Sequence, residues 1–447
     1  MSVSNALTAL PISALRGTVR VPGDKSISHR ALMLASQTVG ESNISGLLEG
    51  EDVLATVAAL RALGVTLERI ELGHWRVHGV GVGGFLEPDD VLNMENSGTS
   101  ARLLLGLLAS HHFTACITGD ASLRRRPMQR VIAPLRQSGA QFISRSNGRL
   151  PLTVQGAALP LPIDYALPVA SAQVKSAILL AGLNTHGTTK IWERYPSRDH
   201  TERMLKALGV PIRISNASEG GNIIELDGRC ELSPFSLDIP ADPSSAAFPL
   251  VAGVLAKTGE VVLPGVCLNP TRTGLLDTLM EMNADISINN IVEVGGEPTG
   301  TLIARPSRLR GVRVPASRAA FMIDEYPILA IAAACAEGVS HFEGIAELKV
   351  KESNRLNAIS EGLNNLGVVV TTGDDWMRIE GLGSSENLRS SRVIPTNMDH
   401  RIAMSFLIAG MVGSSPVTVD DDSAIATSFP DFIDLFQRLG GKFERAR

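Results

Sequence analysis

Cationic side chains recur at matching places along this 447-residue sequence, and their types suit the binding of phosphate and carboxylate groups. Guanidinium groups bind planar oxyanions through paired hydrogen bonds, which an ammonium group cannot imitate. A single Arg near a loop is more often a solvated charge with little effect. The set lies at the polar openings of apolar runs or in the loops between them: Lys25, Arg30, Arg102, Arg126, Arg198, Arg272, Lys351, Arg355 and Arg401. Because these residues recur in register with a repeat, we predict a site for a strongly anionic ligand.

Two glycine-containing segments imitate nucleotide-binding motifs without meeting their requirements. GVGVGG at residues 79–84 fits G-x-G-x-x-G, but FLEPDD follows where a helix should begin. PGDKS has Pro22 where a P-loop needs its second glycine, and Asp24 interrupts the Gly-Lys pair. His200 and His400 each follow an Asp, yet neither has a metal-ligating partner at a standard spacing, and we expect a surface or hydrogen-bonded side chain at His200. The sequence therefore predicts neither ATP nor dinucleotide binding.

The composition is that of a globular protein of two or three domains. Hydrophobic residues make up 44% and charged residues 19% of the chain, while aromatic residues make up only 4%, so the cores must be aliphatic. The formal net charge of −5 argues against a nucleic-acid or membrane-surface binder. The cysteines lie far apart, the first residues lack the basic start of a signal peptide, and the apolar runs are too short to span a bilayer. We therefore expect a reduced, cytoplasmic protein.

The elements that must position the cations form a sixfold repeat. One phrase recurs: an amphipathic helix, then Gly or Asn, then alternating apolar residues. Its copies read LRALGVTLER, LRQSGAQFIS, LKALGVPIRI, LMEMNADISI, LNNLGVVVTT and FQRLGGKFER. Gly and Asn tolerate the left-handed conformation that ends helices, so each copy predicts a helix, a C-cap and a strand. A second helix, apolar with a polar opening, precedes each phrase and should be buried with an accessible N-terminus.

Three repeats in each of two domains is the natural division of six. The sixth repeat stops without a closing strand, and LRGTVRVPG at residues 15–23 reads as a strand with no repeat of its own. We predict that this segment completes the sixth repeat. One domain would then comprise residues 21–241, and a discontinuous domain would comprise residues 1–20 and 242–447. The two chain crossings between them would act as a hinge.

Several segments resemble the EPSP synthase (3-phosphoshikimate 1-carboxyvinyltransferase) family over nearly the whole chain. They are, in order, PGDKSISHR, LRRRPM, SAQVKSAILLAGLN, DEYPILA, VKESNRL and MDHRIAMSF, and SAQVKS and MIDEYP are typical of the bacterial class II branch. The resemblance implies an inside-out α/β barrel fold of two domains, each with three βαβαββ repeats. It implies transfer of the enolpyruvyl group of phosphoenolpyruvate to the 5-hydroxyl of shikimate 3-phosphate, on the shikimate pathway to chorismate and the aromatic amino acids. It also implies a monomer that needs no metal or cofactor and is a target of glyphosate.

The resemblance further assigns roles to individual residues. Asp324 would be the base for the 5-hydroxyl, Glu352 the proton donor to C3 of phosphoenolpyruvate, and Lys25 an assisting group between both substrates. His400 would support the site. The residues implied for shikimate 3-phosphate are Lys25, Ser26, Arg30, Ser171, Ala172, Gln173, Arg198, Asp324 and Lys351. Those implied for phosphoenolpyruvate are Lys25, Gly98, Arg126, Gln173, Arg355 and Arg401.

Simpler structural roles remain open for the two carboxylates. Asp324 could cap the helix that begins EYPILA, and this role is compatible with catalysis. Glu352 could merely pair with Arg355 across a helical turn.

The sequence departs from the family pattern at two places. Thr427 stands where many relatives have Lys, so a cation for phosphoenolpyruvate is missing, and Arg124 or Arg125 could replace it. Gly98 stands where glyphosate-tolerant class II enzymes carry Ala, whose methyl group would crowd the inhibitor, so we predict greater glyphosate sensitivity than in those relatives. Leu103, where sensitive class I enzymes carry Pro, argues in the opposite direction.

Two other functions are compatible with such a fold. A UDP-N-acetylglucosamine enolpyruvyl transferase would carry a reactive Cys before an Arg-Pro pair, but the corresponding loop here is GDASLRRRP. A non-catalytic phosphometabolite-binding module would be expected to lose Asp324 or Glu352, and the sequence retains both.

Overall fold

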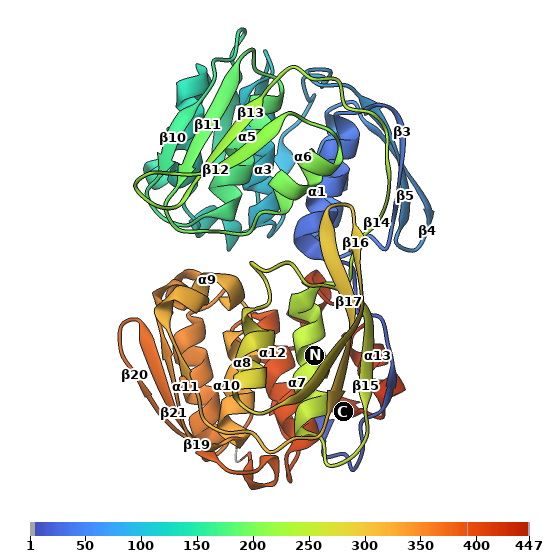
Figure 1. Ribbon diagram of the computed structural model, residues 1–447, viewed down its shortest axis with the longest axis vertical. Coiled ribbons are helices and arrows are strands. Elements are labelled where there is room, and N and C mark those ends of the chain that lie inside the picture. The colour runs from blue at the N-terminus through green and yellow to red at the C-terminus, as the bar shows by residue number, and fades with distance from the viewer. Residues whose placement is uncertain (1–4, 391, 446–447) are drawn as a thin grey trace. The chain divides into compact units, whose positions relative to one another are not determined.

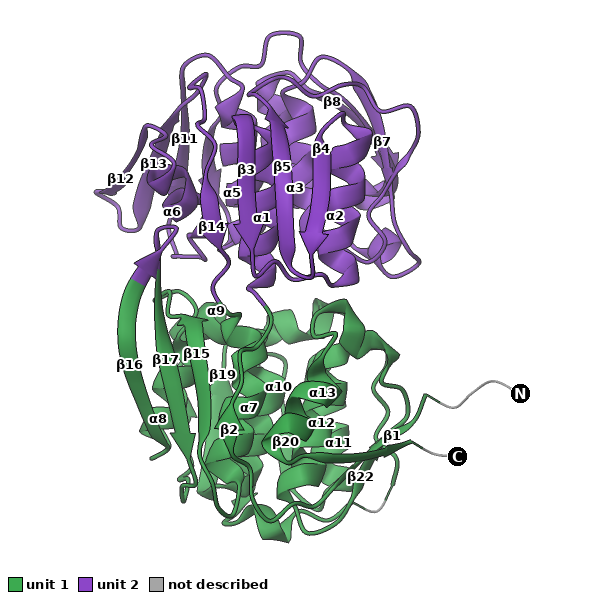
Figure 2. Ribbon diagram, turned by 90° about the vertical axis from the view of Figure 1, so that its right-hand side faces the viewer, with its two compact units in different colours: residues 1–22, 241–292, 298–447 green, residues 23–240, 293–297 purple. Residues whose placement is uncertain are grey.

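The described chain is organised as two compact units. A computed structural model of the protein describes residues 5–390 and 392–445. Unit 1 comprises Met1–Pro22, Ala241–Val292 and Pro298–Arg447, and unit 2 comprises Gly23–Pro240 with the short segment Glu293–Glu297 (Figure 1; Figure 2). Within the described ranges, no helix has both the length and the apolar character needed to cross a membrane.

Unit 2 carries three four-stranded sheets with one shared connectivity. In spatial order, the first sheet is β14 (Ser236–Asp238), β3 (Val39–Ser45), β5 (His74–Val80) and β4 (Thr66–Glu71). The second is β6 (Leu92–Asn93), β7 (Thr114–Thr118), β9 (Arg149–Gln155) and β8 (Gln141–Arg145). The third is β10 (Asp164–Leu167), β11 (Thr188–Glu193), β13 (Asn222–Asp227) and β12 (Ile212–Asn216). In every sheet the first two strands are parallel and the other neighbours antiparallel, as a repeated unit requires.

Two helices accompany each sheet of unit 2. The pairs are α1 (Lys25–Ser36) with α2 (Glu51–Ala62), α3 (Gly98–Ala109) with α4 (Gln129–Leu135), and α5 (Ala172–Leu183) with α6 (His200–Ala207). In α1 and α5, every residue after the first two is buried. In Figure 2, the strands β3, β5 and β4 lie in front of α1, α3 and α2, so the sheet covers the helices from outside. Buried helices whose first residues stay accessible were predicted from the sequence, and the structure confirms them for α1 and α5.

Unit 1 repeats this plan. One sheet is β16 (Asp285–Val294), β17 (Glu297–Arg305), β15 (Val261–Cys267) and β2 (Gly17–Thr18), and another is β18 (Arg313–Val314), β19 (Glu337–Glu343), β21 (Trp376–Leu382) and β20 (Val369–Thr372). The third is β22 (Val417–Val419), β1 (Leu7–Leu10) and β23 (Lys442–Arg445). The helix pairs are α7 (Pro243–Leu255) with α8 (Gly274–Glu281), α10 (Tyr326–Cys335) with α11 (Arg355–Asn365), and α12 (His400–Val412) with α13 (Phe432–Leu439). The short α9 (Ala319–Met322) precedes α10.

The core of unit 1 is built mainly from aliphatic side chains of these internal helices. Every residue of α10 and of α12 is buried, and Phe406 and Phe432 join the same core. A helix that is apolar on all sides is stable only when neighbours surround it. The fold meets this requirement because the sheets cover the helices, which is the inside-out arrangement expected from the resemblance.

The residues that end the recurring helices adopt the backbone conformation that the sequence predicted. All of them have a positive φ: Gly64, Gly139, Gly209, Asn283, Gly367 and Gly440. This left-handed conformation is favourable for Gly and tolerated by Asn. The sixfold repeat is therefore visible in the backbone itself.

The prediction for the N-terminal strand was wrong in its details. From the predicted segment 15–23, β2 pairs in parallel with β15 and so belongs to the fourth repeat. The sixth repeat is completed instead by β1, which is antiparallel to both β22 and β23. In β1 the side chains of Leu7 and Ala9 are buried and the intervening ones only partly, so its alternation fits this sheet.

Candidate active site

The predicted site residues fall into two groups, one in each unit, and each group is described separately. The unit 1 group comprises Asp324, Lys351, Glu352, Arg355 and Arg401. The unit 2 group comprises Lys25, Ser26, Arg30, Gly98, Arg126, Ser171, Ala172, Gln173 and Arg198.

Helix termini position the residues of the unit 1 group. Arg355 is the first residue of α11, whose N-cap Asn354 accepts a hydrogen bond from the backbone N–H of Asn357. Arg401 is the second residue of α12, whose N-cap Asp399 accepts the backbone N–H of Arg401. Capped helix starts fix the backbone from which these side chains leave.

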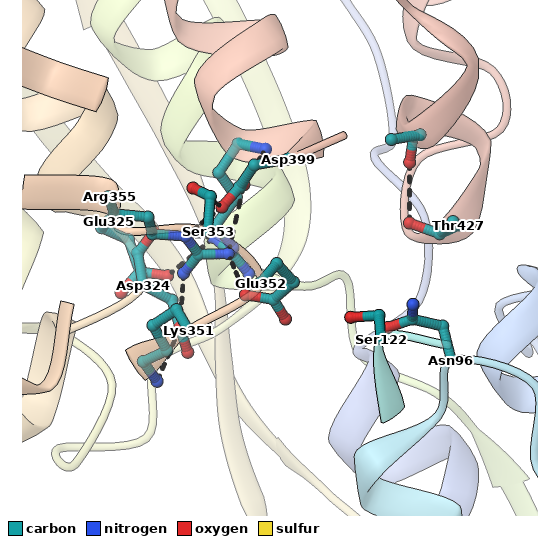
Figure 3. Close-up of polar contacts among 12 residues, drawn as sticks. Asn96, Ser122, Asp324, Glu325, Lys351, Glu352, Ser353, Arg355, Asp399 and Thr427 are labelled. Carbon is teal, nitrogen blue, oxygen red and sulfur yellow. Dashed lines mark hydrogen bonds and ion pairs between the residues drawn. The ribbon is translucent and has the colours of Figure 1, made fainter. Parts of the chain in front are cut away.

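Arg355 lies at the centre of the unit 1 group and holds three carboxylates (Figure 3). Its guanidinium is fully buried, with Nη1 3.1 Å from Asp324 Oδ1 and Nη2 2.6 Å from Glu352 Oε2. Its Nε lies 2.9 Å from Asp399 Oδ2. Planar, multiply hydrogen-bonded contacts of this kind fix geometry as well as charge.

Burial and charge act in opposite directions on Arg355. Burial disfavours the charged guanidinium, but the carboxylate of Asp399 and then those of its two neighbours outweigh burial and raise the pKa of Arg355. Burial likewise acts to raise the pKa of Asp399, but the positive charge of Arg355 outweighs it, and the pKa of Asp399 is lowered. The pair is therefore ionised, and the guanidinium is a fixed cation that draws carboxylates to it.

Asp324 does not cap the helix that follows it. The N-cap of α10 is Glu325, whose side chain makes no cap hydrogen bond, so the cap role left open for Asp324 is wrong. The carboxylate of Asp324 instead lies 3.2 Å from Lys351 Nζ and 3.1 Å from Arg355 Nη1. Its side chain is 18% exposed, so the carboxylate is only partly buried.

Glu352 also differs from its simplest interpretation. It does pair with Arg355, but it lies in the loop before α11, so the pair does not cross a helical turn. Its side chain is 28% exposed, whereas that of Arg355 is 0% exposed. The carboxylate of Glu352 is thus held by a buried guanidinium while its own side chain remains partly exposed to solvent.

Sequence reasoning missed two acidic residues that support this group. Asp399 is fully buried and accepts hydrogen bonds from Arg355, from the Ser353 hydroxyl at 2.9 Å and from the backbone N–H of Arg401 at 3.0 Å. Glu325 lies 3.5 Å from Arg401 Nη1 and accepts a short hydrogen bond from the Ser244 hydroxyl. The signal for Asp399 was its place directly before a buried helix, where an N-cap is expected.

In unit 2, two of the partly exposed cations have defined partners near the starts of α1 and α3. Lys25 Nζ lies 3.0 Å from Asp52 Oδ2. Arg126 Nη2 donates to Asn96 Oδ1 at 2.7 Å and to the Ser122 hydroxyl at 3.3 Å. These contacts orient the two cations at partly exposed positions.

Gln173 belongs to a further polar cluster of unit 2. Its Oε1 accepts from Arg102 Nη1 at 3.1 Å, and its Nε2 donates to the Thr99 hydroxyl at 3.1 Å. Gln173 follows Ala172 at the start of α5, and Ser171 caps that helix by accepting from the backbone N–H of Val174. The structure therefore brings Gln173 close to the start of α3, where Thr99 lies.

Gly98 begins α3 at a crowded point. A Cβ atom at this position would lie 2.7 Å from Arg102 Nη1 and 3.3 Å from Arg126 Nη1. A methyl group there would therefore displace at least one guanidinium. This geometry bears directly on the predicted effect of an Ala in place of Gly98.

Arg30 is buried and holds α1 against α5 and α6. Its Nη2 donates to the Ser176 hydroxyl and its Nε to the Thr201 hydroxyl, each at 2.7 Å, and its Nη1 donates to the carbonyl of Ser26 at 2.9 Å. Burial lowers the pKa of Arg30 to about 10; among the charged neighbours, Glu202 opposes this shift and Arg198 adds to it. The positive charge of Arg198 thus contributes to lowering the pKa of Arg30.

A hydrogen-bonded chain of one imidazole and three hydroxyl groups joins α1, α2 and the start of α3. His29 Nδ1 lies 2.7 Å from the Thr56 hydroxyl, which lies 2.6 Å from that of Ser100, and Ser100 lies 2.6 Å from Ser97. His29 is fully buried, and burial lowers its pKa to about 3. The imidazole is therefore neutral and fixes the relative placement of these helices.

The remaining predictions concern two histidines and Thr427. His200 is completely buried and lies 2.7 Å from Glu297, so it is a hydrogen-bonded residue rather than a surface one. His400 is the first residue of α12 and is buried. The Thr427 hydroxyl donates to the carbonyl of Ala424 at 2.7 Å, at the end of a short 3-10 helix, Ser423–Thr427. Arg124, suggested as a substitute cation, is exposed in unit 2.

Comparisons with known proteins place this geometry in a family. The profile described as EPSP synthase (3-phosphoshikimate 1-carboxyvinyltransferase) matches residues 10–436. A 3-phosphoshikimate 1-carboxyvinyltransferase of Parvibaculum lavamentivorans is 56% identical over 440 residues, which cover 98% of this chain and 97% of that protein. One from Paramagnetospirillum magneticum is 54% identical over 442 residues, 99% of each chain.

Solved structures agree with the sequence relatives. The structure of EPSP synthase from Acinetobacter baumannii has a TM-score of 0.89 and 43% identity, and the match covers 99% of this chain and 100% of that one. The enolpyruvyl transferase NikO from Streptomyces tendae, at 19% identity and a TM-score of 0.75, shares the fold over 99% of both chains. On the extent of these matches, this chain belongs to the EPSP synthase (3-phosphoshikimate 1-carboxyvinyltransferase) family.

Proposed function

We propose that Asp324 and Glu352 carry out the proton transfers of the family's reaction, and that the cations of both units bind its two substrates. As a member of the family, the protein transfers the enolpyruvyl group of phosphoenolpyruvate to the 5-hydroxyl of shikimate 3-phosphate, which yields 5-enolpyruvylshikimate 3-phosphate and phosphate. The observation that carries the residue assignment is the buried guanidinium of Arg355, which holds both carboxylates at 3.1 and 2.6 Å.

The reaction makes specific demands on proton transfer. The 5-hydroxyl oxygen bonds to C2 of phosphoenolpyruvate while C3 gains a proton, which gives a tetrahedral intermediate. Loss of a proton from C3 and departure of phosphate then give the enol ether. In this proposal Asp324 takes the hydroxyl proton and Glu352 supplies the proton to C3, each within a fixed hydrogen-bond geometry. Lys25 assists between the two substrates.

Both substrates are polyanions, so binding depends on fixed positive charge. We assign shikimate 3-phosphate to Lys25, Ser26, Arg30, Ser171, Ala172, Gln173, Arg198, Asp324 and Lys351. We assign phosphoenolpyruvate to Lys25, Gly98, Arg126, Gln173, Arg355 and Arg401. The forked hydrogen-bond geometry of Arg supports its use for the carboxylate and phosphate of phosphoenolpyruvate.

Three further properties belong to this proposal. Glyphosate acts as an inhibitor at the phosphoenolpyruvate site, and Gly98 makes the protein sensitive to it. The protein works as a monomer in the cytoplasm. Its four cysteines, Cys116, Cys230, Cys267 and Cys335, are free thiols, which supports a reducing compartment.

Phosphate release tests the function directly. The purified protein should release phosphate from phosphoenolpyruvate only when shikimate 3-phosphate is added, with formation of the enol ether. Release driven by UDP-N-acetylglucosamine would assign the reaction of the related transferase. Absence of release with either acceptor, together with calorimetric binding of shikimate 3-phosphate, would identify a non-catalytic binding protein instead.

A further inference from the structure

Lys175 is a buried cation of unit 2 to which the proposed function assigns no role. It lies in the second turn of α5, where its ammonium group meets Glu193 at the end of β11 and Glu202 in the first turn of α6. The side chains of Lys175, Glu193 and Glu202 are 1%, 3% and 2% exposed. We call these three residues the Lys175 cluster.

The contacts of Lys175 reach both ends and the middle of one loop. Its Nζ lies 2.9 Å from Glu193 Oε1 and 2.7 Å from Glu202 Oε1. It also donates to the carbonyl of Ser197 at 3.4 Å, and Glu193 accepts from the backbone N–H and the hydroxyl of Ser197. The loop between β11 and α6, residues 194–199, is therefore tied at three points to one ammonium group.

This loop carries Arg198, and the helices on which it is anchored, α5 and α6, also hold Arg30. Thr201 in α6 and Ser176 in α5 accept the two 2.7 Å hydrogen bonds from Arg30, and each is the direct neighbour of a member of the Lys175 cluster. The same two helical turns thus orient Arg30 and anchor the loop of Arg198. A shift of α6 relative to α5 would move both guanidinium groups.

A buried ionic cluster of this kind is a poor source of stability. Removing ions from water costs several kcal/mol per ion, and apolar residues of similar volume often serve stability equally well. Burial acts to lower the pKa of Lys175, but Glu202 and then Glu193 outweigh burial and raise it, so the ammonium is charged. The contribution of such an arrangement is geometric, because one ammonium group fixes the positions of the end of β11, the following loop and the start of α6.

We propose that Lys175 is a positioning residue for shikimate 3-phosphate: it holds the 194–199 loop so that Arg198 stays beside Arg30. This inference deepens the proposed function and rests on its assignment of both arginines to that substrate. Lys175 does not touch the substrate and acts only through the loop.

Steady-state kinetics of Lys175→Met test the proposal. We expect the KM for shikimate 3-phosphate to rise by at least about tenfold, as for the loss of one charge-assisted hydrogen bond. The KM for phosphoenolpyruvate and kcat should stay within about threefold, because the loop does not take part in the proton transfers. Lys190→Met, the same substitution on β11, is the matched control and should change no constant.

A double variant separates geometry from charge. The cluster has a formal net charge of −1, from one ammonium and two carboxylates, and Lys175→Met with Glu202→Gln keeps that charge while removing the tie. It also leaves fewer unpaired buried charges, so it should fold where the single variant does not. The raised KM for shikimate 3-phosphate should persist in the double variant, and Lys175→Arg should restore most of the wild-type value.

Trypsin cleavage after the exposed Arg194 gives a readout that needs no substrate. Both Met variants at position 175 should be cut at Arg194 at least about tenfold faster than the wild type and the Lys190→Met control, since local opening controls cleavage. An unchanged KM for shikimate 3-phosphate in a folded variant, unchanged cleavage, or failure of both variants to fold would each overturn the proposal. Failure of the wild type to use shikimate 3-phosphate would instead refute the proposed function, and the cleavage test would still stand.

Discussion

Arg355 in unit 1 and Arg126 in unit 2 use positive charge differently. In unit 1, Arg355 and Lys351 are bound to carboxylates, so the cations fix the acids in place. In unit 2, Lys25 is likewise paired with Asp52, but the hydrogen bonds of Arg126 go to the amide oxygen of Asn96 and the hydroxyl of Ser122, which orient its guanidinium without cancelling its charge.

This contrast suggests a division of labour. Carboxylates held by a buried cation are suited to moving protons in a fixed geometry. Cations oriented by neutral groups keep their charge for an incoming anion. We therefore expect substitution of the carboxylates around Arg355 to lower kcat or stability, and substitution of Arg126 to raise a KM value.

The largest expected effect is that of Asp324→Asn. The amide keeps the size of the side chain but cannot take the hydroxyl proton, so kcat should fall by about 10²- to 10⁴-fold. Calorimetry should show that shikimate 3-phosphate still binds. A turnover within about threefold of the wild type would remove Asp324 from the role of base and weaken the contrast between the units.

Asp399→Ala should mainly affect stability. It leaves Arg355 with fewer partners in a buried site, and breaking a buried pair typically lowers the free energy of unfolding by about 3–5 kcal/mol. Urea denaturation measures this loss. Asp431→Ala is the matched control: Asp431 caps α13 without a side-chain hydrogen bond and meets Arg438 only at 3.7 Å, so the change should stay within about 1 kcal/mol. Equal losses of unfolding free energy in the two variants would show that the contacts of Asp399 with Arg355 do not contribute to stability.

Arg126→Lys should raise the KM for phosphoenolpyruvate by about tenfold or more while kcat changes little. Lys keeps the charge but lacks the fork that donates to Asn96 and Ser122 and could also reach an oxyanion. Arg136→Lys, the same change at an exposed position of unit 2, should leave the KM as it is. If the kinetic constants of Arg126→Lys match those of this control, Arg126 does not bind phosphoenolpyruvate.

Gly98→Ala should weaken glyphosate inhibition by about tenfold or more, since a misplaced methyl group in a close-fitting site has this order of effect. The added Cβ would displace Arg102 Nη1, 2.7 Å away, and press on Arg126. The KM for phosphoenolpyruvate should rise less than the inhibition constant. Inhibition that does not change would reject the predicted glyphosate contact at this helix start.

The smallest expected effect concerns His29 and pH. The unfolded chain takes up a proton at His29 near pH 6.5, whereas the buried folded residue has a pKa of about 3. The free energy of unfolding should therefore fall as pH drops through this window, by about 1 kcal/mol between pH 6.5 and 5.5. His29→Asn should remove this part of the slope in denaturation curves measured across that range. If the free energy of unfolding depends on pH equally in the wild type and in His29→Asn, then burial does not keep His29 unprotonated.

Local signals allowed much of the fold to be predicted. Gly64, Asn283 and the other helix-ending residues could be identified because the left-handed conformation restricts residue type. The N-terminal strand was misplaced because alternation in residues 7–10 and 15–23 looks alike. Which sheet each joins depends on distant partners, such as β22 and β23 for β1.

The sequence singled out the cations that we propose bind the substrates, but it did not reveal the contacts among buried side chains. Lys25 and Arg126 stand out as cations at repeated positions. Asp399 and Lys175 do not, because their importance comes from contacts with Arg355 and with Glu193 and Glu202, which are distant in sequence. Helix patterns place each residue on an element but do not say which elements pack together.

The placement of helices inside and sheets outside leaves edge strands that can carry reporter groups. Ile214 in β12 of unit 2 is 54% exposed, and Val369 in β20 of unit 1 is 57% exposed. Neither belongs to the buried core of its unit, so a dye attached at each should leave folding intact. The emission of each dye would report on local unfolding of its own unit, at position 214 for unit 2 and at position 369 for unit 1.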